Sequence, residues 1–134
     1  MERLIFTLMM VLGLGHLQAQ TIRDSNNAVL ATISSDGDIR NSNNSLIARI
    51  DRNGEVRDCN NKLLAKIDGR TVRNANNSCL GDIYDDGTVR NSSSAYLGKV
   101  YSDGTVRNAN NSVMGYAKDV PMKYAALFFF FKVF

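Results

Sequence analysis

Histidine is nearly absent from this sequence of 134 residues, since the one copy, His16, lies close to the N-terminus. Residues 1–19 look like a secretory signal peptide, because a short charged start precedes an apolar run over residues 4–14 and small Ala19 offers a cleavage point. We therefore expect a mature chain without histidine. That absence excludes Ser-His-Asp and Cys-His catalysis and most zinc and copper sites.

Tryptophan is absent, and neither sign of charge dominates. The sequence has 16 Lys and Arg and 13 Asp and Glu, for a net charge of +3. The sequence has neither a block of Lys and Arg nor basic residues interleaved with aromatic ones, so we expect no nucleic-acid partner. The apolar run over residues 4–14 is too short for a membrane-spanning helix of about 20 residues, so we also expect no transmembrane span. The predicted location is the periplasm, the outer-membrane surface or the extracellular space.

Cysteine is limited to Cys59 and Cys79, and neither belongs to a CxxC pair. An even pair in an oxidising compartment permits a disulfide. The other interpretation is two small side chains that are at least half-buried. The sequence leaves both open.

What the sequence does have is an internal repeat: "TVRNANNS" occurs at residues 71–78 and again at 105–112. Six similar copies fill residues 21–121, so we assign 20–121 to one repeat domain and 122–134 to its C-terminal segment. One arginine marks each copy, with spacings of 17, 17, 16, 17 and 17 residues: Arg23, Arg40, Arg57, Arg73, Arg90 and Arg107.

Two turn signals alternate along the repeats, an Asn/Ser cluster and an Asp-Gly or Asn-Gly pair. The apolar stretches between them are too short for helices. Asp-Gly and Asn-Gly favour tight hairpins because both residues tolerate positive φ. The sequence thus predicts an all-β fold, a radial array of five to six antiparallel β-hairpins from 17-residue repeats. Whether the "TIR" and "VMGYA" strands pair to close a sixth hairpin stays open. The hairpins are centred on residues 36–37, 53–54, 68–69, 86–87 and 103–104.

The 16-residue copy tests this interpretation, because a residue lost within a strand would turn later side chains to the wrong face. The loss falls at a turn, where "DGR" suits a two-residue turn and "YDDGT" suits a three-residue loop with a Gly bulge. Val72 should therefore face the same side as Val89 and Val106.

The expected core consists of the β-branched residue before each repeat arginine and of Ile33, Ile50, Ile67, Ile83 and Val100 across each hairpin. Two residues before each of the latter stands an alanine or glycine. A small residue on the buried face indicates either hairpins that converge on a common centre or a backbone bulge.

The repeat arginines should lie on the opposite, outer face. One interpretation is an anion- or polysaccharide-binding surface formed by Arg40, Arg57, Arg73, Arg90 and Arg107. The other is that arginine stems cover apolar area while their heads meet neighbouring Asp or Asn.

The segment 122–134, "MKYAALFFFFKVF", is the most apolar part of the mature chain, and its 13 residues are too few to span a bilayer as a helix. Apolar side chains on all sides predict nearly complete burial as a plug. Ala125 and Ala126 favour a short helix, whereas the four phenylalanines and Val133 favour a strand. We predict a short helix.

Together, the signal peptide, units such as "DGTVRNANNSVMG" and the tail "AALFFFFKVF" resemble the five-fold beta-flower proteins, small exported proteins of Bacteroidetes bacteria. The resemblance covers nearly all of the mature chain. It implies β-hairpins that radiate like petals, and it brings no catalytic motif and no assigned function.

We predict a non-enzymatic exported protein without a cofactor that serves as a binding or scaffolding module, since repeats multiply a weak surface. Its partner would be a polysaccharide or another cell-envelope protein, and the Asn/Ser turns make a glycan-binding module one alternative. The others are a calcium-stabilised protein, from the acidic stretches at 51–55 and 85–87, and an outer-membrane-associated one.

Overall fold

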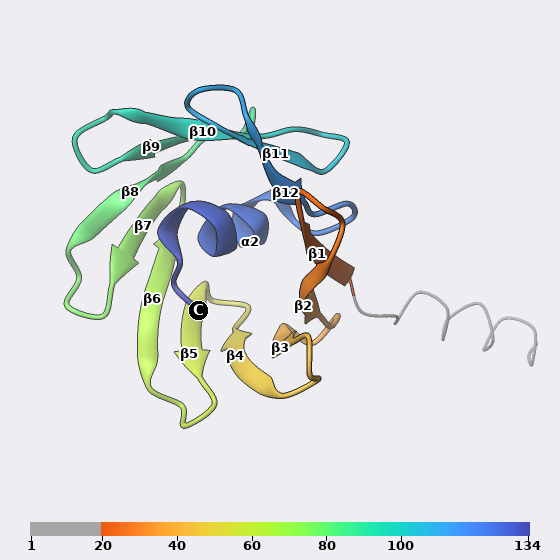
Figure 1. The fold of residues 1–134 in the computed structure, drawn as a ribbon. Helices are drawn as coiled ribbons and strands as arrows, with labels where there is room; N and C mark the ends of the chain where they lie inside the picture. The colour runs from red at the N-terminus through yellow and green to blue at the C-terminus, as the bar shows by residue number, and fades with distance from the viewer. Residues whose placement is uncertain (1–19) are drawn as a thin grey trace, which may run out of the picture.

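The computed structural model describes residues 20–134, and the predicted signal peptide lies outside that range. Twelve short strands form one closed antiparallel sheet around a C-terminal helix (Figure 1). The strands are β1 (Gln20–Asp24), β2 (Val29–Ile33), β3 (Asp38–Asn41), β4 (Leu46–Ile50), β5 (Glu55–Asp58), β6 (Leu63–Asp68), β7 (Thr71–Asn74), β8 (Cys79–Ile83), β9 (Thr88–Asn91), β10 (Tyr96–Val100), β11 (Thr105–Asn108) and β12 (Val113–Tyr116).

Each strand pairs with the strands before and after it in the chain, and β1 pairs with β12 to close the ring. The closing pair places Arg23 opposite Tyr116 and Asp24 opposite Gly115. The Gly-turn pair β10·β11 has the same register, with Arg107 opposite Lys99. The "TIR" and "VMGYA" strands therefore do pair. Because the sheet is continuous, the number of separate hairpins, expected as five to six, stays a prediction.

Turns with Asn at one end of the sheet alternate with turns containing Gly at the other. Four Gly turns are three-residue loops, as in Ser34–Asp38, where the Ser34 amide donates to the Asp38 carbonyl at 2.9 Å and Gly37 has φ of +89°. In the short copy Asp68 pairs with Thr71, so the loop residues are Gly69 and Arg70. The two-residue turn is confirmed, but its centre at residues 68–69 was wrong by one position.

The turn carbonyls also link neighbouring hairpins. In each of the five Gly turns, the last loop residue accepts a hydrogen bond from the backbone of the next even-numbered strand or, at the seam, from Ala117. The donor and acceptor pairs are Ile50 N to Gly37 O, Ile67 N to Gly54 O, Ile83 N to Arg70 O, Val100 N to Gly87 O and Ala117 N to Gly104 O, at 2.7–2.9 Å.

The inner face carries the predicted core. The Ile or Val before each repeat arginine is fully buried, and Val72 faces inward with Val89 and Val106 as the turn argument requires. Ile67, beside the shortened turn, is only half-buried. The backbone-bulge explanation for the small residues is confirmed, because every Asn-turn pair has a register shift directly before them. The bulged residues are Leu30, Ile47, Leu64, Leu80, Leu97 and Met114.

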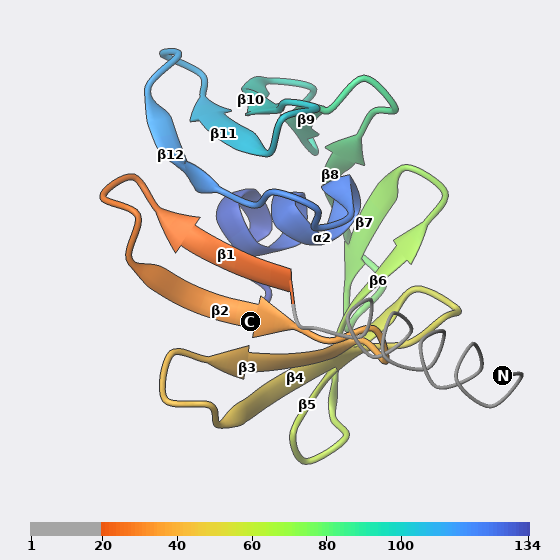
Figure 2. The same cartoon turned by 90° about the vertical axis from the view of Figure 1, so that its right-hand side faces the viewer.

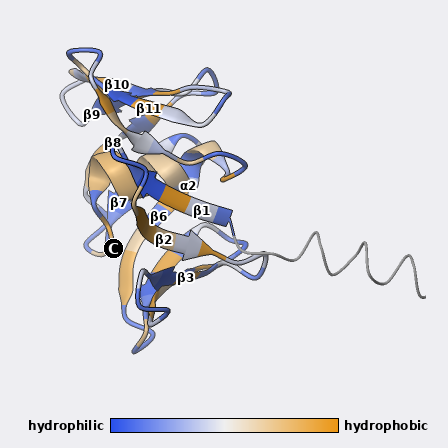
Figure 3. Cartoon of the chain, turned by 45° about the vertical axis from the view of Figure 1, so that its right-hand side comes forward, coloured by the Kyte–Doolittle hydropathy of each residue, from blue (hydrophilic) through white to orange (hydrophobic). Residues whose placement is uncertain are grey.

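The C-terminal segment enters the ring as a helix, as predicted. An α-helical turn, α2 (Met122–Ala126), continues into a π-helical turn, η1 (Leu127–Phe131). Figure 2 shows this helix inside the ring of strands, and Figure 3 shows that it carries predominantly hydrophobic residues while the loops at the strand ends are hydrophilic. Nearly complete burial was wrong, because Leu127 and Phe129 are buried but Phe128, Phe130, Phe131 and Phe134 are half-buried.

Three consecutive phenylalanines pack against the three glycines of the second half of the ring. A Cβ added at any of these glycines would collide with a phenylalanine ring carbon. The distance from the added Cβ to the ring carbon is 2.8 Å for Gly81 and Phe131, 2.6 Å for Gly98 and Phe130, and 2.7 Å for Gly115 and Phe129. The first half has alanines at the equivalent positions: Ala31, Ala48 and Ala65. The helix therefore crowds the glycine side of the ring.

The burial of the phenylalanines predicts how much each contributes. We expect Phe129→Ala to lower the free energy of unfolding by about 3 to 5 kcal/mol, because a ring that is 6 % exposed leaves a cavity. The half-buried Phe134 serves as the matched control, and Phe134→Ala should cost less than half as much. Urea unfolding of both variants measures this, and equal losses would contradict the central role of the helix.

Candidate functional site

The repeat arginines, for which a binding surface is one of the two sequence interpretations, lie beside the Asn turns in all six copies. In each copy Nη1 of the arginine donates to the backbone carbonyl four residues later, at 2.9–3.2 Å. The arginine side chains are half-buried. The pattern matches the second interpretation in part, since the arginine heads meet the Asn turns through their carbonyls. Sequence spacing could have found it, because an Arg stands four residues before the last turn residue in every copy.

The Asn turn itself is a three-residue loop whose last residue has a left-handed backbone, as in the copy 74–78. The Asn74 amide donates to the Ser78 carbonyl at 2.9 Å, and Asn77 has φ of +68°. The Asn74 Oδ1 accepts from the backbone amides of Asn76 at 2.9 Å and Ser78 at 3.0 Å. Asn and Asp make such bonds to following amides more readily than other residues, and Asn tolerates positive φ.

The six Asn turns are nearly identical in conformation. Their left-handed residues have φ between 67° and 71°: Asn27, Asn44, Asn61, Asn77, Ser94 and Asn111. The loop residues before them are exposed in every copy. We call these six turns, residues 25–27, 42–44, 59–61, 75–77, 92–94 and 109–111, the Asn rim. The rim is a rigid surface of exposed amides and hydroxyls.

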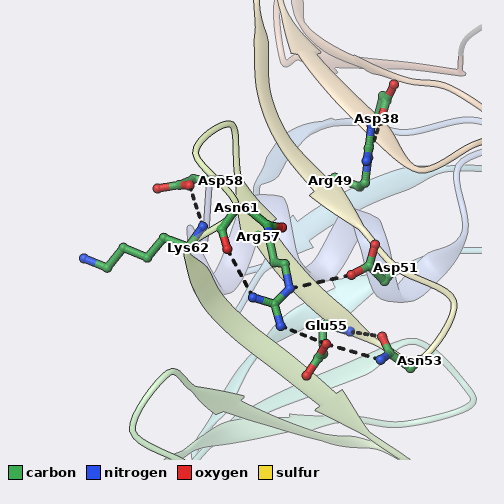
Figure 4. A network of polar contacts seen from close by, with 9 residues as sticks. All are labelled: Asp38, Arg49, Asp51, Asn53, Glu55, Arg57, Asp58, Asn61 and Lys62. Carbon is green, nitrogen blue, oxygen red and sulfur yellow. Dashed lines mark hydrogen bonds and ion pairs between the residues drawn. The ribbon is translucent and has the colours of Figure 1, made fainter.

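Charge on the outer face is locally compensated around Arg57 (Figure 4). Its guanidinium donates to the Asn61 carbonyl at 3.1 Å and to the Glu55 carboxylate at 3.1 Å, and it lies 3.8 Å from the Asp51 carboxylate. The hydrogen bond from Arg57 lowers the pKa of Glu55 below its ordinary value. On β4, Arg49 forms an ion pair with Asp38 at 2.8 Å. Arg49 and Arg57 lie directly opposite each other, and these ion pairs offset the repulsion between their like charges.

The Gly-turn end of the ring has hollows between neighbouring turns. A hollow of about 510 Å³ lies between the β6–β7 and β8–β9 turns and is lined by Arg70, Tyr84, Asp85, Asp86 and Lys123 together with Gly69. A second, of about 370 Å³, is lined in part by Val100, Ala117 and Met122. A third, of about 310 Å³, includes Gln20, Arg52 and Tyr124. Sequence reasoning missed these hollows, because they depend on how the helix meets the turns.

Two features bear on the remaining sequence expectations. Cys59 and Cys79 are both exposed and are not joined by a disulfide. Within residues 20–134, no three side chains of His, Cys, Asp and Glu come together as metal ligands, and the acidic stretches at 51–55 and 85–87 form turns. Within residues 20–134 there is no helix that is long and apolar enough to cross a membrane.

A family model described as "5-fold beta-flower protein" matches residues 19–132. No curated protein matches the chain.

One turn of the Asn rim has Ser instead of Asn at its left-handed residue. Ser94 has φ of +67°, where five other copies have Asn. Because Asn is favoured in the left-handed region, we expect Ser94→Asn to raise the free energy of unfolding by about 0.5 kcal/mol. Ser93→Asn is the control, since that position has no positive φ, and it should leave stability unchanged. A lower urea midpoint for Ser94→Asn than for the parent protein would contradict the turn geometry.

Two Gly turns predict acid sensitivity. The pKa of Asp86 is lowered by its hydrogen bonds from Thr88, the backbone amide first, and that of Asp103 is lowered likewise by Thr105. A carboxylate whose folded pKa is depressed stabilises the fold above its unfolded pKa of about 3.8 and loses that contribution as pH falls through the folded value. We therefore expect the melting temperature to fall below about pH 4.

The matched variants are Asp86→Asn and Asp103→Asn. An amide oxygen still accepts the turn bond, as Asn53 does from the Glu55 amide at 3.2 Å, but it does not titrate over this range. The loss of melting temperature between pH 5 and pH 2.5 should therefore shrink in the double variant. Asp85→Asn removes the same charge without that turn bond, and a change as large as that of Asp86→Asn would contradict the assignment.

Proposed function

Because the chain belongs to the 5-fold beta-flower family and folds as a closed ring of repeats, we propose that it is a non-enzymatic binding module that uses the Asn rim as its contact surface. The observation that carries the proposal is the repetition of one exposed turn conformation six times around a closed sheet. Repetition turns a weak contact into a strong one when a partner carries matching repeats. A polysaccharide is such a partner, and a cell-envelope protein that bears glycans is another source of the same chemistry.

The chemistry of the rim favours a hydroxyl-rich ligand. Amide and hydroxyl side chains both donate and accept hydrogen bonds, which suits sugar hydroxyls. The positions at the middle of the loops carry exposed Asn in five copies and Ser in one: Asn26, Asn43, Asn60, Asn76, Ser93 and Asn110. Their backbone amides are held by the first turn residue in each copy, so the loops are ordered before a ligand arrives.

Arg40, Arg57, Arg73, Arg90 and Arg107 would contribute in two ways. Each fixes its turn through the carbonyl bond described above. A guanidinium carries five N–H groups, so donors remain beyond that bond for an acidic or hydroxylated ligand. We propose that the arginines support the rim in this way.

A non-enzymatic role is supported by the acidic residues. A general acid in glycoside hydrolysis needs a carboxyl group with a raised pKa. Among the described residues, the carboxylates with a displaced pKa, Glu55, Asp86 and Asp103, are all lowered by hydrogen bonds. Export to the cell envelope or beyond is part of the same proposal and follows from the signal-peptide pattern in residues 1–19.

Affinity electrophoresis in gels that contain plant, yeast and bacterial polysaccharides tests the rim. We expect retention by at least one polymer, a loss of a few-fold for Asn76→Ala alone, and a loss of at least about 100-fold for Asn43→Ala, Asn60→Ala, Asn76→Ala and Asn110→Ala together. Arg73→Gln should weaken retention to a similar extent as Asn76→Ala.

The control carries four alanines at exposed positions of the opposite end, Ser35, Arg52, Ser102 and Lys118, and should be retained like the parent protein. Absence of retention by every polymer, or undiminished retention of the quadruple Asn variant, would remove the proposal.

A further inference from the structure

The shortened repeat creates a feature that the other copies lack. In four Gly turns the residue whose carbonyl bonds to the next hairpin is a glycine with φ of +88° to +93°. A Cβ on Gly37, Gly54 or Gly87 would collide with a carbonyl of the next hairpin, and one on Gly104 would collide with Lys118. In the two-residue turn this place is taken by Arg70, whose carbonyl accepts from Ile83 at 2.8 Å. The loss of one residue therefore puts a long cationic side chain at a place where the other four copies have no side chain.

Arg70 is exposed and lies over an aromatic ring. Its guanidinium carbon lies 4.9 Å from the centre of the Tyr84 ring, at the edge of the 510 Å³ hollow between the β6–β7 and β8–β9 turns. Stacking on an aromatic ring fixes the guanidinium plane and leaves its edge free to bind a carboxylate through two parallel hydrogen bonds. Lys123 lies on the same side, where its ammonium group donates to the Gly69 carbonyl at 2.8 Å, which is a neutral acceptor.

The other wall of the hollow is anionic. Asp85 and Asp86 belong to the β8–β9 turn and line the hollow opposite the Gly69–Arg70 turn. Asp86 accepts a hydrogen bond from the Thr88 amide at 2.9 Å. The ion pairs within residues 20–134 involve Arg49 and Arg57 as cations. The two cations and two carboxylates of the hollow therefore line one space without making ion pairs to each other.

A ligand with charges of both signs matches this arrangement. We propose that the hollow is a binding site for a small zwitterion, a molecule or peptide end that carries a carboxylate and an ammonium group. The carboxylate binds Arg70 and Lys123, and the ammonium group binds Asp85 and Asp86. Opposed charges across a binding surface select a partner with the complementary pattern and disfavour ligands of a single charge. The site is formed at one pair of neighbouring turns and does not depend on the Asn rim.

The separation between the two walls can be measured with ligands of graded length. We would titrate the protein with glycine, 4-aminobutyrate and 6-aminohexanoate and follow backbone amide signals by NMR. The expected result is saturable shifts at residues 69–70, 84–86 and 123, with one chain length preferred. Butyrate and butylamine carry one charge each, and both should bind at least tenfold more weakly than the preferred zwitterion.

Two variants assign the ends of the ligand. Arg70→Gln should weaken the preferred zwitterion at least tenfold, and Asp85→Asn should do the same without weakening butyrate. Arg52→Gln, on another Gly turn, is the matched control and should bind like the parent protein. If butyrate binds as tightly as every zwitterion, the hollow is a general anion site. If no amide signal of these residues shifts at ligand concentrations up to about 50 mM, the hollow is not a binding site. Either result overturns the proposal.

Discussion

The fold depends on filling the centre of the ring. A closed sheet of eight strands has an interior that side chains just fill, and twelve strands enclose a wider one. The inward-facing side chains here are mostly Ile, Val, Ala and Gly, which are too short to meet across that space. The helix formed by α2 and η1 supplies the missing volume with Ala125, Ala126, Leu127 and the phenylalanines. Without it the β-branched residues would have no layer to pack against.

A helix cannot match the symmetry of six repeats, and the sequence of the ring reflects this conflict. Successive side chains on a helix point in different directions, so Phe129, Phe130 and Phe131 reach three different hairpins. The glycines that receive them all lie in the second half of the chain, and the alanines lie in the first. The small residue of each copy is therefore matched to the part of the helix that it faces. Copies that look interchangeable as sequence have different roles in the packing.

Much of the fold could be predicted from the sequence because its signals are local. The alternation of turn signals predicts the strands. Because the residue missing from the short copy falls at a turn, side chains after it keep the same face of the sheet, which predicts that the valines are buried. The closing pair β1·β12 could not be decided, because it joins residues about 90 positions apart. The half-buried phenylalanines of the C-terminal segment could not be foreseen either, because their exposure depends on how the helix meets the ring. The arginine positions were predicted but their bonds to turn carbonyls were not, although the constant spacing of four residues to the last turn residue carries that signal.

Symmetry also distinguishes the ligands that we propose for the two ends of the ring. A residue that recurs in every copy makes the same weak contact six times, which favours a long repetitive partner and gives little discrimination between small molecules. A residue that occurs once, such as Arg70, can act only in one place, and its surroundings can combine several charges. The loss of one residue from one turn is small enough to leave the ring closed, since the Arg70 carbonyl still makes the bond that glycine makes elsewhere. A repeat fold can therefore gain a unique site without losing its repeated one, provided that the change falls where the strands turn.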